Sequence, residues 1–253
     1  MLMQGKVCVV TGAASLHGIG RATAHMLAAN GAHVVVIDVS DNVDQVARDI
    51  AADHPSSSIL GVKCNIVDSA ACEEAATRVS RAFNQVDALI HCAGVIRSGR
   101  YDQISEQDFD EVIAINLAGT FNILRSFTPA MVAQRAGSIV TVASVAAQRG
   151  GGLVGGAHYA ASKGAVLSLT KSLARELGPM GVRVNAVCPS LIETDFVTGA
   201  VSKDRIRDLT AAIPLGRPGR PDEVAAACMF LASDLSSYIT GATLDVNGGS
   251  HIH

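Results

Sequence analysis

Apolar runs of strand length alternate with longer helix-patterned segments along this chain, and the alternation limits the possible folds more than any other feature. The runs are KVCVVT, HVVVID, ILGVKC, ALIHC, SIVTVAS, RVNAVC and ATLDV. Their near-continuous hydrophobicity is typical of strands buried on both faces, and helical spacers are what parallel crossovers require. The pattern therefore predicts an α/β protein with a doubly wound sheet flanked by helices.

The segments between the runs predict one domain over residues 1–253. The clearest helical spacers are RATAHMLAAN, SEQDFDEVIAINLAGTFNILRSFTPAMVAQ and AASKGAVLSLTKSLARELG. No linker, repeat or low-complexity stretch divides the sequence. The most irregular region lies between Pro189 and Pro221 and holds further prolines, so we expect a loop-rich lid at about 190–213.

Charge and hydropathy argue against several classes of partner. With a formal net charge of −3 at pH 7 and scattered basic residues, the chain has no electrostatic footprint for nucleic acid or an anionic membrane. The first residues, MLMQGKVCVV, lack the features of a signal peptide, and no apolar run reaches ~18 residues. We therefore expect a soluble cytoplasmic protein. The six cysteines show no C-x-x-C spacing, so we expect neither a metal site nor a disulfide.

A glycine-rich turn, TGAASLHGIG at residues 11–20, joins the first expected strand to the first expected helix. Such a turn lets the backbone approach a pyrophosphate, and the helix N-terminus offers amide donors to it. Because the G-x-G-x-x-G fingerprint is absent, the turn alone is equally compatible with an ordinary tight connection.

The second expected strand ends in Asp38, 18 residues after Gly20. A carboxylate at this place suits the ribose hydroxyls of an adenosine, and its alternative role is a strand-end cap. The carboxylate would repel a 2′-phosphate, and no Arg or Lys occupies the turn or the positions just after Asp38. The sequence therefore favours NAD over NADP.

The segment HYAASKGAV, residues 158–166, holds a tyrosine and a lysine four positions apart in an otherwise apolar stretch. In a helix, positions i and i+4 share one face, so Tyr159 and Lys163 are expected to be neighbours. A phenol beside an ammonium is a pairing that acid/base chemistry can use. A buried packing role for Tyr159 is the alternative.

Taken in order, these motifs resemble the classical short-chain dehydrogenase/reductase (SDR) family across essentially the whole chain. The resemblance rests on the TG…GIG turn, Asp38, HCAG at 91–94, Asn116 in NLAGT, Ser144 after SIVTVA, Tyr159-x-x-x-Lys163 and PSLIET at 189–194. It implies a single NAD(P)-binding Rossmann-type domain with a seven-stranded parallel sheet. It also implies a homotetramer built largely through the long helices that carry Asn116 and Tyr159.

The resemblance implies a catalytic set of four residues. Tyr159 would be the acid/base, and because an unperturbed phenol has a pKa of ~10, positive charge from Lys163 would be needed to stabilise its phenolate. Ser144 would hold the substrate oxygen, and Asn116 would hold a water that connects Lys163 to solvent. Their alternative roles are a strand-end cap for Ser144 and a helix-kink residue for Asn116.

The resemblance also implies a set of cofactor contacts. Lys163 would bond the nicotinamide ribose beside Tyr159, and the backbone of Ile192 and the hydroxyl of Thr194 would hold the carboxamide. The phosphate turn, the adenine-flanking pair and the stretch beside the adenine ribose would be formed by Gly12, Gly18, Ile19 and Gly20, by Asn65 and Ile66, and by Ala93 and Gly94.

The phosphate turn departs from the family pattern in its length. Five residues, AASLH, lie between Gly12 and Gly18, where the family pattern has three. The two extra residues leave open whether Ser15, Leu16 and His17 contact the cofactor.

Other departures lie in HCAG and in the loop before Tyr159. His91 stands where the family often has an amide, and we expect a hydrogen-bonded core histidine. Asn65 keeps an acceptor for the adenine amino group but lacks the usual charge. The loop AAQRGGGLVGGAHY is longer than usual, and its glycines would either approach a substrate or relieve a tight path. For seven polar residues the sequence is compatible both with a surface position and with a substrate contact: Gln148, His158, Glu193, Arg97, Arg100, Tyr101 and Arg149.

The sequence therefore favours an NAD-dependent oxidoreductase that interconverts a secondary alcohol and a ketone, with a polyol or sugar as a candidate substrate. One alternative is a 3-ketoacyl-(carrier protein) reductase, which normally needs NADPH and a basic docking patch. A second is a nucleotide-sensing protein that does no chemistry, although such a protein would be expected to lose Tyr159 or Lys163. The C-terminal SHIH is a candidate to reach a neighbouring subunit's cleft.

Overall fold

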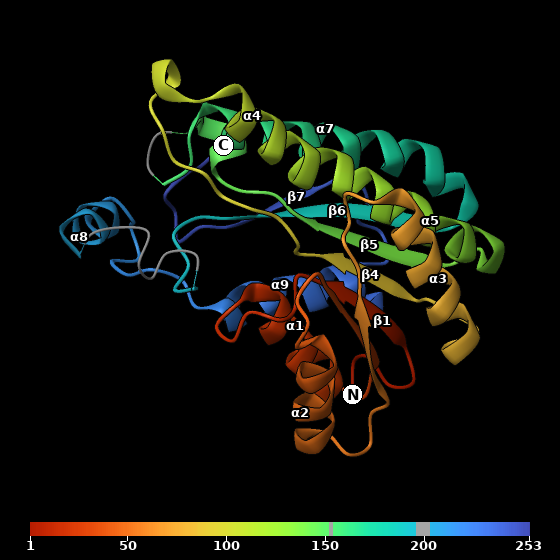
Figure 1. The fold of residues 1–253 in the computed structure, drawn as a ribbon. Coiled ribbons are helices and arrows are strands. Elements are labelled where there is room, and N and C mark those ends of the chain that lie inside the picture. The colour runs from red at the N-terminus through yellow and green to blue at the C-terminus, as the bar shows by residue number, and fades with distance from the viewer. Residues whose placement is uncertain (152–153, 196–202) are drawn as a thin grey trace.

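The computed structural model describes residues 1–151, 154–195 and 203–253. In this part of the chain, seven strands form one parallel sheet with the order β3-β2-β1-β4-β5-β6-β7 (Figure 1). The doubly wound, seven-stranded sheet expected from the sequence is confirmed. The strands are β1 (Val7–Thr11), β2 (His33–Asp38), β3 (Ile59–Lys63), β4 (Ala88–His91), β5 (Gly137–Val142), β6 (Val182–Pro189) and β7 (Thr243–Val246).

Helices cover both faces of the sheet. Figure 1 shows one face covered by α1 (Ile19–Ala29), α2 (Val43–Asp53) and α9 (Pro221–Ala232). The other face is covered by α3 (Ser69–Phe83), α4 (Glu106–Ile113), α5 (Thr120–Gln134) and α7 (Ala157–Leu177). Two shorter helices, α6 (Ala146–Arg149) and α8 (Lys203–Ala211), follow β5 and β6.

The strands are apolar without interruption because they contribute to two cores at once. Alternate side chains of a strand point to opposite faces. Val10 and Val36 accordingly belong to the core under α1, α2 and α9, whereas Val9 and Val35 belong to the core under α3, α5 and α7. The long apolar runs in the sequence are the consequence of this two-sided burial.

The strand order reverses between β1 and β4, so consecutive crossovers leave the sheet on opposite sides at this point. The carboxyl ends of the two strands lie together, with Thr11 paired to His91. In open α/β sheets, ligands bind in the crevice outside the strand ends at such a switch point. The topology therefore brings the phosphate turn after β1 and the HCAG segment after β4 to one crevice.

The segment expected to form the lid is only partly within the described residues. Residues 196–202 of the expected lid lie outside them. Within the described part, the region holds a helix, α8, in addition to loop. In Figure 1, α8 stands apart from the sheet near the carboxyl ends of the strands. No helix among the described residues is long and apolar enough to cross a membrane.

Candidate active site

The phosphate turn is held in shape by glycines that no other residue could replace without a clash. Gly12 has φ +68°, and a Cβ there would lie 2.7 Å from the backbone of Ala93. A Cβ at Gly20 would lie 2.3 Å from the carbonyl oxygen of Gly12. These contacts bring the start of α1, with Gly18 as its N-cap, against the ends of β1 and β4. The result is a cradle of backbone and helix N-terminus that fits the pyrophosphate of a dinucleotide.

Asp38 closes the adenosine side of the crevice. Its Oδ2 accepts a hydrogen bond from the amide of Ala14 at 2.9 Å, and its Oδ1 accepts from the amide of Ser40 at 3.1 Å. The carboxylate therefore does act as a cap, but each oxygen keeps a further lone pair for a ribose hydroxyl. The cavity beside it is also lined by the expected adenosine contacts Asn65, Ile66, Ala93 and Gly94.

A second cavity continues from the phosphate turn toward the catalytic residues. Ser144, Tyr159 and Lys163 line it together with Ile192 and Thr194. Gly12, Gly18, Ile19, Gly20 and Gly94 line the same cavity. The two cavities together thus take in each of the site residues expected from the sequence except Asn116.

The environment of Tyr159 and Lys163 is set by burial. Lys163 donates from Nζ to the carbonyl oxygen of Val142 at 2.8 Å, and burial lowers the pKa of its ammonium to about 8. Burial raises the pKa of Tyr159 above its ordinary value, and a hydrogen bond with Ser144 partly offsets this. The protein's own groups therefore favour a protonated phenol, so the expected lowering of this pKa requires further positive charge.

Asn116 lies behind the crevice, fully buried in a π turn, Ala114–Gly119, between α4 and α5. Its amide accepts from the Val95 amide at 2.8 Å and donates to the Val95 carbonyl at 2.9 Å. It also donates to Oγ of Ser162 in α7 at 3.0 Å. The side chain fixes the chain after β4 against α7, and π turns are frequent at functional sites.

Comparison with known proteins agrees with this geometry. A family model described as enoyl-(acyl carrier protein) reductase matches residues 12–251. An uncharacterized short-chain type dehydrogenase/reductase from Sinorhizobium fredii is 44% identical and covers 100% of both chains. The chain belongs to the classical short-chain dehydrogenase/reductase family.

Two further members of the SDR family carry more specific names. A 3-oxoacyl-(acyl-carrier-protein) reductase from Thermotoga maritima is 40% identical over 98% of this chain and 99% of its own. A crystal structure of a putative NAD(P)-dependent gluconate 5-dehydrogenase from Beutenbergia cavernae, with NADP bound at low occupancy, has a TM-score of 0.91. It is 38% identical, over 98% of this chain and 97% of that one. These names agree on the family of oxidoreductases and differ in substrate.

His91 is a core histidine, as the sequence led us to expect in this SDR. It is 2% exposed, and its ring nitrogens lie 2.8 Å from Oγ1 of Thr11 and 3.0 Å from Oγ1 of Thr120. Thr120 in turn donates to the carbonyl oxygen of Asn116 at 2.5 Å. Burial and the charge of Lys163 lower the pKa of His91 to about 3, so the ring is neutral.

The glycine-rich loop of this SDR packs on the catalytic helix itself. A Cβ at Gly155 would lie 2.2 Å from Cδ1 of Tyr159, and one at Gly156 would lie 2.8 Å from Cε1 of His158. The loop glycines therefore let the backbone approach the aromatic rings at the start of α7. Between the two uses expected from the sequence, the structure favours relief of a tight path at these two positions.

The two extra residues of the phosphate turn allow a contact across the crevice that the sequence motifs did not reveal. Ser15 donates from Oγ to Oδ2 of Asp195 at 2.7 Å, and the His17 amide donates to the same oxygen at 3.1 Å. His17 Nδ1 lies 2.8 Å from Oδ1. These donors lower the pKa of Asp195 to about 2. The only signal in the sequence was the length of the turn.

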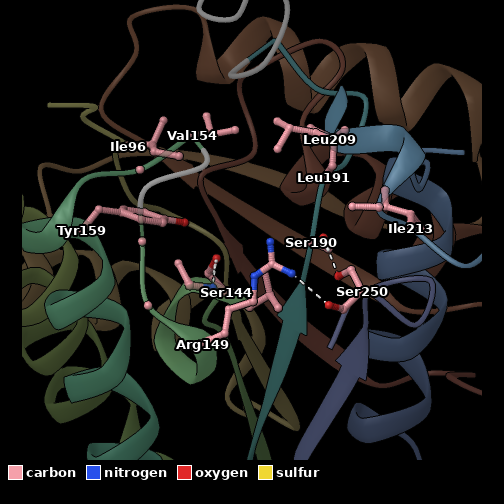
Figure 2. A pocket seen from close by; sticks show the side chains of 16 residues that line it. Ile96, Ser144, Arg149, Val154, Tyr159, Ser190, Leu191, Leu209, Ile213 and Ser250 are labelled. Carbon is pink, nitrogen blue, oxygen red and sulfur yellow. Dashed lines mark hydrogen bonds between the residues drawn. The ribbon is translucent and has the colours of Figure 1, made fainter. Parts of the chain in front are cut away.

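A third cavity beside Ser144 and Tyr159 is the expected place for the substrate of this SDR (Figure 2). The C-terminal segment reaches it, because Arg149 donates from Nη1 to the carbonyl oxygen of Ser250 at 2.8 Å. Ser250 itself lines the cavity, and His253 lies 3.2 Å from Asp245 in β7 of the same chain. The sequence indicated the C-terminal SHIH only as a candidate for a neighbouring subunit's cleft, and it did not indicate Ser190 as a residue of this cavity. Apolar residues that line the cavity are Ile96, Val145, Ala146, Val154, Leu191, Leu209, Ala212 and Ile213.

Proposed function

We propose that this protein is an NAD-dependent oxidoreductase that interconverts a secondary alcohol and a ketone. The observation that carries the proposal is the meeting of Ser144, Tyr159 and Lys163 at one cavity, into which the phosphate turn also opens. A polyol or sugar is the first substrate class to test. The Beutenbergia structure is named as a putative gluconate 5-dehydrogenase, and gluconate is a polyhydroxy acid, which supports this choice.

The residues divide the reaction between them. Ser144 holds the substrate oxygen and stabilises the charge that develops there, and Tyr159 gives or takes the proton at the same oxygen. Lys163 stabilises the phenolate and would bond the nicotinamide ribose of a bound cofactor, while Ile192 and Thr194 would orient its carboxamide. Bound NAD supplies the hydride acceptor and a positive charge. Burial leaves the phenol protonated in the protein's own field, which is consistent with a need for that charge.

The water that would connect Lys163 to solvent is assigned to the π turn. The Asn116 side chain is already hydrogen-bonded to Val95 and Ser162, so a backbone carbonyl of the turn would be the group that binds this water. An i→i+5 turn displaces carbonyl groups from regular helical bonding. Asn116 therefore acts as the residue that holds this turn beside Lys163.

The choice of NAD rests on the charges around the adenosine cavity. Among the described residues that line it, Asp38 and Glu111 are acidic and none is Lys or Arg. A 2′-phosphate would meet the carboxylate of Asp38 without a compensating cation. We expect kcat/KM with NAD to exceed that with NADP, and Asp38→Ser to narrow the ratio. An unchanged ratio in the variant would contradict the assignment to Asp38.

A 3-oxoacyl-(carrier protein) reductase is the second candidate. The 40% identity to the Thermotoga enzyme of that name and the apolar lining of the substrate cavity favour it. The acidic side chains around the adenosine cavity argue against it, because such a reductase normally needs NADPH. Acetoacetyl-CoA with NADH and with NADPH separates the two candidates, because the reductase would prefer this thioester to free polyols.

The test of the main proposal is oxidation of a panel of secondary alcohols, polyols and sugars with NAD, followed by absorbance of the reduced cofactor. Tyr159→Phe is measured in parallel. We expect turnover by the wild type and its loss in the variant. Turnover that survives Tyr159→Phe would refute the mechanism, and NAD binding without turnover of any compound would favour a nucleotide-sensing protein. The proposal also includes a homotetramer, which rests on the family resemblance, and a cytoplasmic location, which rests on the sequence expectation.

A further inference from the structure

We propose that Arg149 selects a substrate that carries an anionic group, a carboxylate or a phosphate ester, close to the reacting carbonyl. The inference rests on the proposed function, because it concerns the same reaction at the same site, and it puts an anionic compound in place of the polyol or sugar as the substrate class. It is drawn from the polar groups of the substrate cavity and from the partners that each of them has.

Arg149 is the only cation among the described residues that line the substrate cavity, and no acidic side chain lines it there. Figure 2 shows its guanidinium directed into the cavity, between Ser144 on one side and Ser190 and Ser250 on the other. The lining otherwise consists of apolar side chains, glycines and the serines and tyrosine of the site. The guanidinium thus shares this cavity with Ser144 and Tyr159, the two residues that would bind the reacting oxygen.

The guanidinium is oriented by the protein but not neutralised by it. Nη1 donates to the carbonyl oxygen of Ser250, which is uncharged. In the described part of the chain, the guanidinium forms no ion pair with a carboxylate. Arginine has five N–H donors in a fixed fork that matches the two oxygens of a carboxylate or phosphate. One donor used on Ser250 leaves the others for a ligand.

The other two arginines that the sequence left open as substrate contacts form ion pairs with acidic side chains. Arg97 forms an ion pair with Glu111 at 2.8 Å, and Arg100 forms one with Asp102 at 3.2 Å. Neither side chain lines the substrate cavity. Arg149 therefore differs from both in position and in having no acidic partner among the described residues.

The segment that carries Arg149 is fixed by contacts unrelated to a ligand. The neighbouring Gln148 donates from Nε2 to Oδ1 of Asp245 at 2.7 Å and lies 3.0 Å from Nε2 of His253. Ser250 donates from Oγ to Oγ of Ser190 at 2.9 Å. The end of α6, the C-terminal segment and the residue after β6 thus form one connected rim, so Arg149 is presented on a supported element.

The opposite part of the cavity limits the rest of the substrate. Leu191, Leu209 and Ile213 form an apolar cluster to which Val154 adds. This surface favours carbon over further hydroxyl groups. The substrate class that fits is a hydroxy or oxo compound with an anionic group on one side of the reacting carbon and an apolar portion on the other.

The test compares anionic ketones with neutral counterparts of the same carbon skeleton around the carbonyl. Reduction by NADH is measured for acetoacetate and methyl acetoacetate, for levulinate and methyl levulinate, and for dihydroxyacetone phosphate and dihydroxyacetone. The variants are Arg149→Met, which removes the charge at similar length, and Arg149→Lys, which keeps it. Arg100→Met is the matched control, because Arg100 lies outside the cavity and has its own acidic partner.

We expect the wild type to prefer at least one anion over its neutral partner. Arg149→Met should lower that ratio of kcat/KM by about 10- to 100-fold, mainly through KM, because a charge-assisted hydrogen bond is lost. Arg149→Lys should retain part of the ratio, and Arg100→Met should leave it unchanged. Preference for the carboxylates or for the phosphate identifies which anion is recognised.

Binding of the same anions to the enzyme–NADH complex, followed by NADH fluorescence, gives a readout that does not need turnover. Equal or better use of the neutral partners by the wild type, or a ratio unaffected by Arg149→Met, overturns the inference while the proposed function stands. Failure of every anion to bind overturns it as well. Binding that depends on Arg149 without any reduction would support the inference and refute the proposed reaction.

Discussion

At the residue scale, the ordered motifs predicted which side chains would line the site. They were less successful in predicting the contacts of each side chain. Asp38 is both a cap for Ala14 and Ser40 and a wall of the adenosine cavity, so two roles weighed as alternatives coexist. Asn116 was expected to hold a water, yet its amide bonds Val95 and Ser162. Partners 21 and 46 positions away lie outside any local pattern, so the sequence could not indicate them.

The bonds around His91 fix its tautomer. Since Thr120 donates its hydroxyl proton to the Asn116 carbonyl, it must accept from Nε2–H of the ring. Nδ1 is then the acceptor for the hydroxyl of Thr11, whose oxygen accepts from the Ala93 amide at 3.2 Å. The neutral ring satisfies every group in this set of hydrogen bonds, whereas a protonated ring would place its Nδ1–H against the hydroxyl proton of Thr11.

This neutrality predicts a pH dependence of stability. The folded pKa of His91 is about 3, below its value of 6.5 in the unfolded chain, so between these pH values only the unfolded state binds the proton. The free energy of unfolding should therefore fall as pH drops below 6.5, with a slope of up to about 1.4 kcal/mol per pH unit. Urea unfolding of the wild type and of His91→Asn at pH 7, 5 and 4 measures the difference. Parallel losses in both proteins would contradict the assignment to His91.

The contact between Gly155 and the Tyr159 ring predicts a defect of catalysis. A Cβ 2.2 Å from Cδ1 forces the ring or the loop to move, and a displaced acid/base loses its alignment. Gly155→Ala should lower kcat by about 10- to 100-fold with a smaller effect on NAD binding. Gly164→Ala, on helix α7 with Tyr159, is the control, since its Cβ would meet only the Ala147 carbonyl at 3.9 Å. Equal kcat values for the Gly155→Ala and Gly164→Ala variants would show that the loop moves without displacing Tyr159.

At the scale of elements, strands and helices could be predicted because burial imposes their periodicity, whereas two features could not. The π turn at Ala114–Gly119 does not interrupt the apolar pattern of α4 and α5, so the sequence indicated an irregularity only through the alternative of a helix-kink role for Asn116. Helix α8 is a polar segment in a proline-bounded region, which favoured a loop in the sequence. Its buried Leu209 joins a cluster with Leu191 and Ile213, and such a contact is visible only in the folded chain.

The contact between the phosphate turn and Asp195 predicts an effect on cofactor affinity. The Asp195 carboxylate accepts from the His17 amide, a donor of the turn, and places a negative charge at the rim of a crevice suited to a pyrophosphate. Asp195→Asn removes the charge and should tighten NAD binding by about two- to fivefold at low salt, less at high salt. Calorimetry at two ionic strengths measures this. Weaker NAD binding in the variant would instead mean that the contact of Asp195 with the phosphate turn stabilises the crevice in the shape that binds NAD.

At the scale of the whole molecule, the strand order decides where function lies. Reversal between β1 and β4 gathers turns from distant parts of the sequence at one edge, and the site residues span positions 12–194. Each sequence motif was located at the end of a strand or on a helix that follows one, so the meeting of these residues could be anticipated once the sheet was predicted. The substrate cavity could be anticipated in part, because Leu191, Leu209 and Ile213 lie in the segment expected to form a lid, whereas the approach of Ser250 to the cavity of its own chain could not.

The expected tetramer makes a prediction about two aromatic side chains. Phe109 on α4 and Phe121 on α5 are 47% and 48% exposed, with the Arg125 guanidinium 5.8 Å from the Phe121 ring centroid. A single exposed aromatic side chain needs no explanation, but these two lie on the long helices through which the family resemblance places subunit contacts. Light scattering after size exclusion should give a tetramer for the wild type and smaller species for Phe109→Glu combined with Phe121→Glu.

A matched change elsewhere separates assembly from general damage by a surface charge. Tyr238 follows the 3₁₀ helix Asp234–Ser236, on neither α4 nor α5, and is fully exposed, so Tyr238→Glu should remain tetrameric. If assembly positions α4 and the π turn, the double variant should also lose turnover, because Asn116 lies in that turn and bonds Ser162 of α7. A tetramer that survives both phenylalanine changes would move the interface to another surface, and a monomeric wild type would remove the tetramer from the proposed function.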